Sequence, residues 1–162
     1  MAERATTQRR GLVALVGAVA AAVLLAFTPK FEGTELATYR DLGGVLTYCT
    51  GATEDAAWGK TYTPAQCRAQ LDRDLERHAA GIAKCIPLGR LTDGQRVAFV
   101  DAAYNIGVTG FCGSSMARRT NAGDMVGACD ALLMWNKVGG KEVRGLTRRR
   151  QAERELCLKG LP

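Results

Sequence analysis

Several features that indicate a metal centre are missing from this sequence of 162 residues. It has one histidine, His78, and its six cysteines form no closely spaced C-x-x-C pair. Zinc sites are built from such close pairs of cysteine and histidine ligands. We therefore expect no bound metal and no cofactor.

The first 48 residues contain no cysteine, so a disulfide exchange that involves the N-terminal segment is excluded. An even number of cysteines in a chain that reaches an oxidising compartment favours disulfides over reduced core thiols. The sequence leaves about 15 pairings open. The six cysteines are Cys49, Cys67, Cys85, Cys112, Cys129 and Cys157.

Charge is also absent from residues 11–29, which lie between Arg10 and Lys30. As a helix this segment would span roughly 28 Å, close to the hydrocarbon thickness of a bilayer. The basic residues before it, Arg4, Arg9 and Arg10, should stay in the cytoplasm and send the rest of the chain outward.

Three fates of this segment are open: a cleaved signal peptide, a permanent anchor, and an anchor that can leave the membrane. The end of the apolar run, Ala26-Phe27-Thr28-Pro29, is a poor match to the small-residue pattern of a cleavage site. Eight of the 17 residues from Gly11 to Phe27 are alanine or glycine, which is a marginal apolar content for a permanent anchor. This content favours the third fate.

The remainder of the chain has the composition of one globular domain, with 47% hydrophobic and 23% charged residues overall. The net charge of +6 suits an anionic partner such as nucleic acid, lipid or cell wall, and does not choose among them.

The pattern of turns and caps predicts an α+β fold that is mainly α. Thr28-Pro29 is typical of a helix start, and we expect that helix to continue to about Thr38. The turn signal at 41–44 and the β-branched run at 45–49 predict a β-hairpin. Capping boxes at Thr63 and Thr92 begin long helices, Ser114 caps a short one, and further helices cover 125–135 and 147–158 before Gly160. The result is a small hairpin lobe followed by a larger helical lobe.

Three residues near the hairpin could hydrolyse a glycosidic bond, which needs a carboxylic acid to protonate the leaving oxygen and a group that orients water. Glu32 offers the acid, Asp41 a carboxylate, and Thr47 a hydroxyl on the following strand. Each has an ordinary explanation as well: a glutamate that favours the helix dipole, an aspartate in a turn, and a threonine in a strand.

The combined spacing resembles the Glu/Asp/Thr catalytic set of the phage lysozyme family, with eight residues between Glu32 and Asp41 and five between Asp41 and Thr47. The resemblance covers residues 30–162 and is closest to the lambdoid members. It rests on Glu32-Gly33, Thr50-Gly51, Gly59-Lys60-Thr61-Tyr62-Thr63, Ala103-Tyr104-Asn105-Ile106-Gly107, Asn121-Ala122-Gly123-Asp124, Trp135, Gly145-Leu146 and Arg148-Arg149.

This resemblance implies a lysozyme-like fold and an endolysin that cuts between N-acetylmuramic acid and N-acetylglucosamine in peptidoglycan to lyse the host. Glu32 would be the general acid, and Asp41 and Thr47 would position water or stabilise the transition state. Tyr104 and Asn105 could line the sugar cleft. The chain divides into a signal-anchor-release segment (1–29) and a catalytic domain (30–162).

The expected partners are peptidoglycan and, before release, the host inner membrane through residues 11–29, with the N-terminus in the cytoplasm; after release the protein would be a periplasmic monomer that binds no nucleic acid. Glu32 follows the apolar segment by roughly 5 Å of helical rise, so the tethered form should be inactive.

One position departs from the family pattern: Ala52 stands where histidine is usual, which puts the stability of the hairpin in doubt. Other residues have structural interpretations. We expect His78 at the surface, Trp135 in the core, and residues 148–150, three arginines, on a solvated face.

Two other functions compete. A lytic transglycosylase would need no positioned water, which Asp41 and Thr47 argue against. An anchored wall-binding module would explain the basic charge and the cysteines and would leave the Glu32/Asp41/Thr47 spacing to chance.

Overall fold

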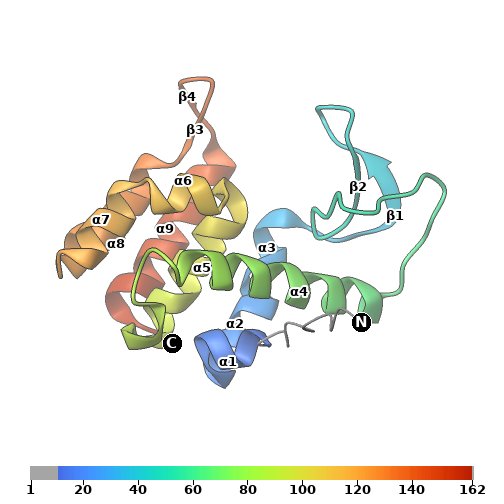
Figure 1. Ribbon diagram of the computed structural model, residues 1–162. Helices are drawn as coiled ribbons and strands as arrows, with labels where there is room; N and C mark the ends of the chain where they lie inside the picture. The colour runs from blue at the N-terminus through green and yellow to red at the C-terminus, as the bar shows by residue number, and fades with distance from the viewer. Residues whose placement is uncertain (1–10, 162) are drawn as a thin grey trace, which may run out of the picture.

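A β-hairpin lobe stands beside a larger helical lobe in the computed structural model, which describes residues 11–161 (Figure 1). The hairpin consists of β1 (Glu35–Arg40) and β2 (Leu46–Cys49), which pair antiparallel. Helix α4 (Pro64–Ile82) leads from this lobe into the other. The predicted α+β architecture, mainly helical with a small hairpin near the start, is confirmed.

The helical lobe is built on α5 (Asp93–Ile106) and α9 (Arg144–Lys159), which lie side by side. One short element, η1, precedes α5, and the other short elements lie between α5 and α9 in the sequence. In chain order, the short elements are η1 (Leu88–Arg90), α6 (Val108–Cys112), α7 (Ser115–Asn121), α8 (Met125–Ala131), η2 (Leu132–Met134), β3 (Lys137–Val138) and β4 (Lys141–Glu142).

Local capping signals begin these helices as the sequence predicts. Thr63 and Gln66 form a capping box before α4, and Thr92 and Gln95 form another before α5. The Ser114 side chain accepts a hydrogen bond from the Ala117 N–H and caps α7. Each cap satisfies N–H groups that a helix start leaves without a partner.

The apolar N-terminal segment forms two helices, α1 (Leu12–Val16) and α2 (Ala18–Phe27), and they pack into the core of the helical lobe. Gly17, with φ +86°, separates them. Among the described residues, no helix combines the length and the apolar content needed to span a membrane. The inward side of the segment is fully or almost fully buried, through Leu12, Val16, Ala20, Ala21 and Leu24.

The helix that we expected from Pro29 to about Thr38 is much shorter, so this prediction is wrong. Helix α3 covers only Pro29–Glu32, because Gly33 takes a left-handed conformation (φ +73°) and directs the chain into β1. The Thr28 side chain does not cap α3. It bonds to Asp101 instead, at 2.7 Å.

All six cysteines form disulfides, which the sequence favoured without assigning their partners. Cys49–Cys67 ties the hairpin to α4, Cys85–Cys112 ties the turn after α4 to α6, and Cys129–Cys157 ties α8 to α9. The first bond fastens the hairpin to the helical lobe, and the other two lie within the helical lobe.

Candidate active site

A groove of about 380 Å³ runs between the hairpin lobe and helices α4 and α5. Its lining includes Glu32, the Gly51 backbone after β2, Asp74 and His78 of α4, and Tyr104 at the end of α5. A second hollow of about 490 Å³ continues on the other side of Glu32 and is lined in part by α9. Because Glu32 and Asn105 line both, the groove passes directly over them.

Glu32 is the last residue of α3, and its position is fixed by backbone and side-chain contacts. Its N–H donates to the Thr28 carbonyl at 3.2 Å, and its carboxylate forms an ion pair with Arg149. The other carboxylate oxygen faces Gly51, where a β-carbon would be 3.9 Å away. The Glu32 side chain is 22% exposed, so it remains open to the groove.

Arg149 and Arg150 are buried, so the expectation that residues 148–150 form a solvated face is wrong for two of the three. Arg149 makes hydrogen bonds to both carboxylate oxygens of Asp101, at 2.9 and 3.1 Å. Burial alone would lower the pKa of Arg149, but the negative charges of Asp101 and Glu32 outweigh it and raise the pKa. The guanidinium is therefore always charged.

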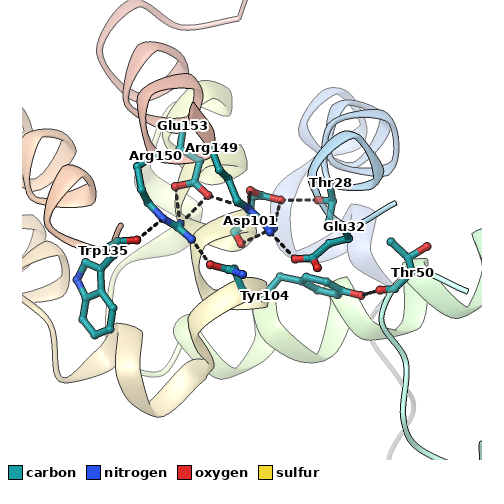
Figure 2. A network of polar contacts seen from close by, with 10 residues as sticks. Thr28, Glu32, Thr50, Asp101, Tyr104, Trp135, Arg149, Arg150 and Glu153 are labelled. Carbon is teal, nitrogen blue, oxygen red and sulfur yellow. Dashed lines mark hydrogen bonds and ion pairs between the residues drawn. The ribbon is translucent and has the colours of Figure 1, made fainter. Parts of the chain in front are cut away.

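Arg150 is held in the same way by Glu153, at 2.7 and 2.8 Å, and contacts the side-chain oxygen of Asn105 (Figure 2). A row of arginines with nearby glutamates on one helix looks like an exposed charged face in the sequence. Arg149 is buried against the carboxylate of Asp101, which is 48 positions away and is not indicated by any local pattern. Asp101 is not among the residues that the sequence indicated as functional.

Asp41 and Thr47 lie close together on the hairpin, and both contact Val45. The Asp41 carboxylate accepts hydrogen bonds from the N–H groups of Gly43 and Val45, each at 2.9 Å. The Thr47 hydroxyl donates to the Val45 carbonyl at 3.1 Å. Neither residue is among the described residues that line the two parts of the groove.

Tyr39 is the residue paired with Thr47 across the hairpin. Burial raises the pKa of Tyr39, and the charges of Glu35, Asp41 and Glu32 raise it further. Asp41 and Glu32 therefore both lie within electrostatic range of the same phenol.

Tyr104 and Asn105 both line the groove. The Tyr104 hydroxyl donates to the Thr50 carbonyl and links α5 to the end of the hairpin. Burial, together with the charges of Asp74 and Glu32, raises the pKa of Tyr104. It is therefore a neutral hydrogen-bond donor at physiological pH.

The far wall of the groove is polar, and the sequence analysis did not single it out. His78, which we expected at the surface, lines it and lies 5.2 Å from the ring of Tyr104. Asp74 on the preceding turn is hydrogen-bonded to Gln70 and Arg77. Burial raises the pKa of Asp74, although Arg77 and His78 act against it.

Ala52, the position that departs from the family pattern, is buried and takes part in a β-bridge. Its N–H donates to the Tyr48 carbonyl at 2.9 Å, and the Tyr48 N–H donates to its carbonyl at 2.8 Å. The backbone alone makes these bonds, so the hairpin end does not depend on a histidine side chain here.

Comparison with known proteins identifies the family to which this arrangement belongs. Residues 29–153 match the phage lysozyme family. The chain belongs to this family. A curated relative, the SAR-endolysin of Enterobacteria phage P21, is 40% identical over 94% of this chain and 96% of its own length.

Solved structures of other phage lysozymes share the fold. An endolysin from Escherichia coli O157:H7 phage FAHEc1 superposes with a TM-score of 0.76 at 33% identity, over 85% of this chain and 92% of that one. The active form of the P1 phage endolysin Lyz also gives a TM-score of 0.76, at 26% identity, over 88% of this chain and 85% of that one. This phage lysozyme is therefore a glycoside hydrolase with a lysozyme-like fold.

Proposed function

We propose that this phage lysozyme is a signal-anchor-release endolysin that hydrolyses the β-1,4 bond between N-acetylmuramic acid and N-acetylglucosamine to lyse the host. The observation that carries the proposal is the position of Glu32 on the floor of a groove between two lobes. A sugar chain in this groove would cross the Glu32 carboxyl. The family match and the names of the relatives support the same activity.

In the proposed reaction, Glu32 donates a proton to the leaving glycosidic oxygen. Asp41 and Thr47 act from the hairpin, where they orient water or stabilise the charge that develops on the sugar ring. Two backbone N–H donors hold the Asp41 carboxylate in one orientation, as a group with such a role requires. Tyr104 and Asn105 contact the sugars.

Glu32→Gln tests this mechanism because glutamine keeps the shape of the side chain and cannot supply the proton. We expect wall degradation to fall by about 10²–10⁴-fold, with the melting temperature close to that of the wild type. The matched control is Glu155→Gln, on an exposed part of α9 where the carboxylate pairs with Lys159. Rapid wall degradation by Glu32→Gln would refute the mechanism. Mass spectrometry of the products should show that water has been added.

Before release, residues 11–29 would lie in the host inner membrane with the N-terminus in the cytoplasm, and the enzyme would be inactive. Support comes from the apolar side chains on both the buried and the exposed sides of this segment. Its buried side fits the protein core, yet Val13 and Val19 are more than half exposed in the folded molecule. A segment of this kind has apolar surface for either environment. After release into the periplasm it would take the docked position seen in Figure 1.

Docking also explains why the tethered form would lack activity. Helix α2 ends at Phe27 and α3 begins at Pro29, so the turn that carries Glu32 continues directly from the segment. While the segment spans a bilayer, this turn lies at the headgroups and cannot pack against the hairpin and α9.

A further inference from the structure

A buried chain of polar contacts leads from the end of the apolar segment to Glu32 (Figure 2). It begins at Thr28, which has no exposed surface and whose hydroxyl donates to Oδ1 of Asp101 at 2.7 Å. Asp101 is also fully buried, in the middle of α5. The residue that follows α2 is therefore joined to α5 by a hydrogen bond between side chains that are 73 positions apart.

Asp101 in turn fixes Arg149. Its two oxygens accept hydrogen bonds from Nε and Nη2 of the guanidinium, at 2.9 and 3.1 Å, and its backbone carbonyl accepts a longer one at 3.4 Å. Paired bonds of this kind fix the plane of the guanidinium as well as its position. The remaining nitrogen of the group, Nη1, then contacts the Glu32 carboxylate.

The oxygen that Thr28 contacts is also one of the two that hold Arg149. Oδ1 of Asp101 accepts from the Thr28 hydroxyl and from Arg149 Nη2. A buried carboxylate oxygen is costly to leave without a donor, so we expect Asp101 to move toward the remaining donors when the Thr28 hydroxyl is absent. Here that movement would shift the guanidinium, and the guanidinium would shift Glu32.

We infer that Thr28, Asp101 and Arg149 are positioning residues for Glu32, and that docking of the apolar segment completes this set by delivering the Thr28 hydroxyl to Asp101. The inference rests on the proposed role of Glu32 as the acid. According to this inference, the segment packs against the core and also brings a hydroxyl group to the residues that position Glu32. Thr28 also contacts Glu32 directly, because its backbone carbonyl accepts a hydrogen bond from the Glu32 N–H.

The inference is tested by Thr28→Val, which removes the hydroxyl and keeps the branched shape. The protein is the full chain in its released form, and kcat and KM are measured on soluble peptidoglycan fragments. We expect kcat to fall by about ten-fold or more, because displacement of a catalytic group by a fraction of an ångström slows the reaction, and KM to change by less than about two-fold. Thr28→Ser, which restores the donor, should recover most of the kcat.

Thr120→Val is the matched control. Thr120 is also a buried threonine with one hydrogen bond from its hydroxyl, to the Met116 carbonyl at 2.8 Å, but it lies in α7. The Thr120→Val variant should lose about as much unfolding free energy as Thr28→Val, with no change in kcat. If Thr28→Val lowers kcat no more than Thr120→Val, or if serine does not rescue it, the inference is overturned.

A second variant covers the case in which Thr28→Val does not fold. Arg149→Lys keeps the positive charge and loses the paired bonds to Asp101. Folded Arg149→Lys should show the same loss of kcat with little change in KM, and a wild-type kcat would overturn the inference. If Glu32→Gln is inactive while Thr28→Val and Arg149→Lys are fully active, the positioning role is rejected and the proposed function stands. Active Glu32→Gln would reject the proposed function itself.

Discussion

Gly94 packs against the carbonyl oxygen of Leu156 at the point where α5 begins beside the end of α9. A β-carbon on Gly94 would lie 2.9 Å from the Cα of Gly160 and still closer to that oxygen. The neighbouring atoms are backbone and cannot rotate away. This contact sets the spacing of the two helices that carry Asp101 and Arg149, so it bears on the site as well as on stability.

We expect Gly94→Ala to lower the free energy of unfolding by about 1–3 kcal/mol, the usual cost of added volume in a packed interior. Urea unfolding followed by circular dichroism measures it. Gly89→Ala is the control, because a β-carbon there meets nothing within 4 Å and its φ is not in the left-handed region. Equal stability of the two variants would contradict the close packing of α5 on α9.

The second prediction concerns Glu153, which is fully buried between Arg149 and Arg150 (Figure 2). Burial raises its pKa well above the ordinary value, and the charge of Asp101 raises it further, against the two arginines. A carboxyl with a higher pKa in the folded state binds more protons when folded than when unfolded. Its contribution to stability is therefore greatest below its ordinary pKa of about 4 and is lost as pH rises toward the folded pKa.

Glutamine has no such dependence, so Glu153→Gln should gain stability relative to the wild type as pH rises from about 4 to about 8. The measurement is the unfolding free energy of both proteins across this range. Glu155→Gln is again the control, because Lys159 lowers the pKa of that exposed carboxyl and the sign is reversed. A constant difference between Glu153→Gln and wild type would mean that Glu153 has an ordinary pKa.

Local signals in the sequence were sufficient for much of the fold. Each capping box depends on residues three positions apart, so Thr63 with Gln66 and Thr92 with Gln95 could be identified without any tertiary information. The hairpin followed from its turn residues. The end of α3 was missed because the left-handed conformation of Gly33 depends on how β1 packs, and a glycine after a glutamate does not by itself end a helix.

The site was predictable in outline only. Glu32, Tyr104 and Asn105 line one groove, but their supports are long-range contacts that no local pattern indicates. Arg149 reaches across 117 positions to Glu32, and Asp101 looks in the sequence like an ordinary polar residue of a helix. The pairing of the cysteines is also a long-range property that no local pattern indicates. Spacing could suggest which residues act, and only the fold could show what holds them.

The last prediction concerns release from the membrane. Ala14, Ala18 and Ala22 all lie on the exposed side of the docked segment, so leucine at these positions would not disturb the core. Three leucines strengthen membrane insertion by about 1–2 kcal/mol, or roughly ten-fold in the partition of the segment. We expect the triple variant to stay in the membrane fraction of expressing cells and to delay or abolish lysis.

The control adds the same apolar surface outside the segment, at three exposed alanines, Ala69, Ala83 and Ala122. This variant should be released and should lyse cells as the wild type does, which separates membrane retention from a general effect of surface leucines. Purified in detergent-free buffer, both variants should have similar melting temperatures, because both sets of leucines face solvent. Normal lysis by the segment variant, with the protein in the periplasmic fraction, would mean that the marginal apolar content of residues 11–29 does not govern release.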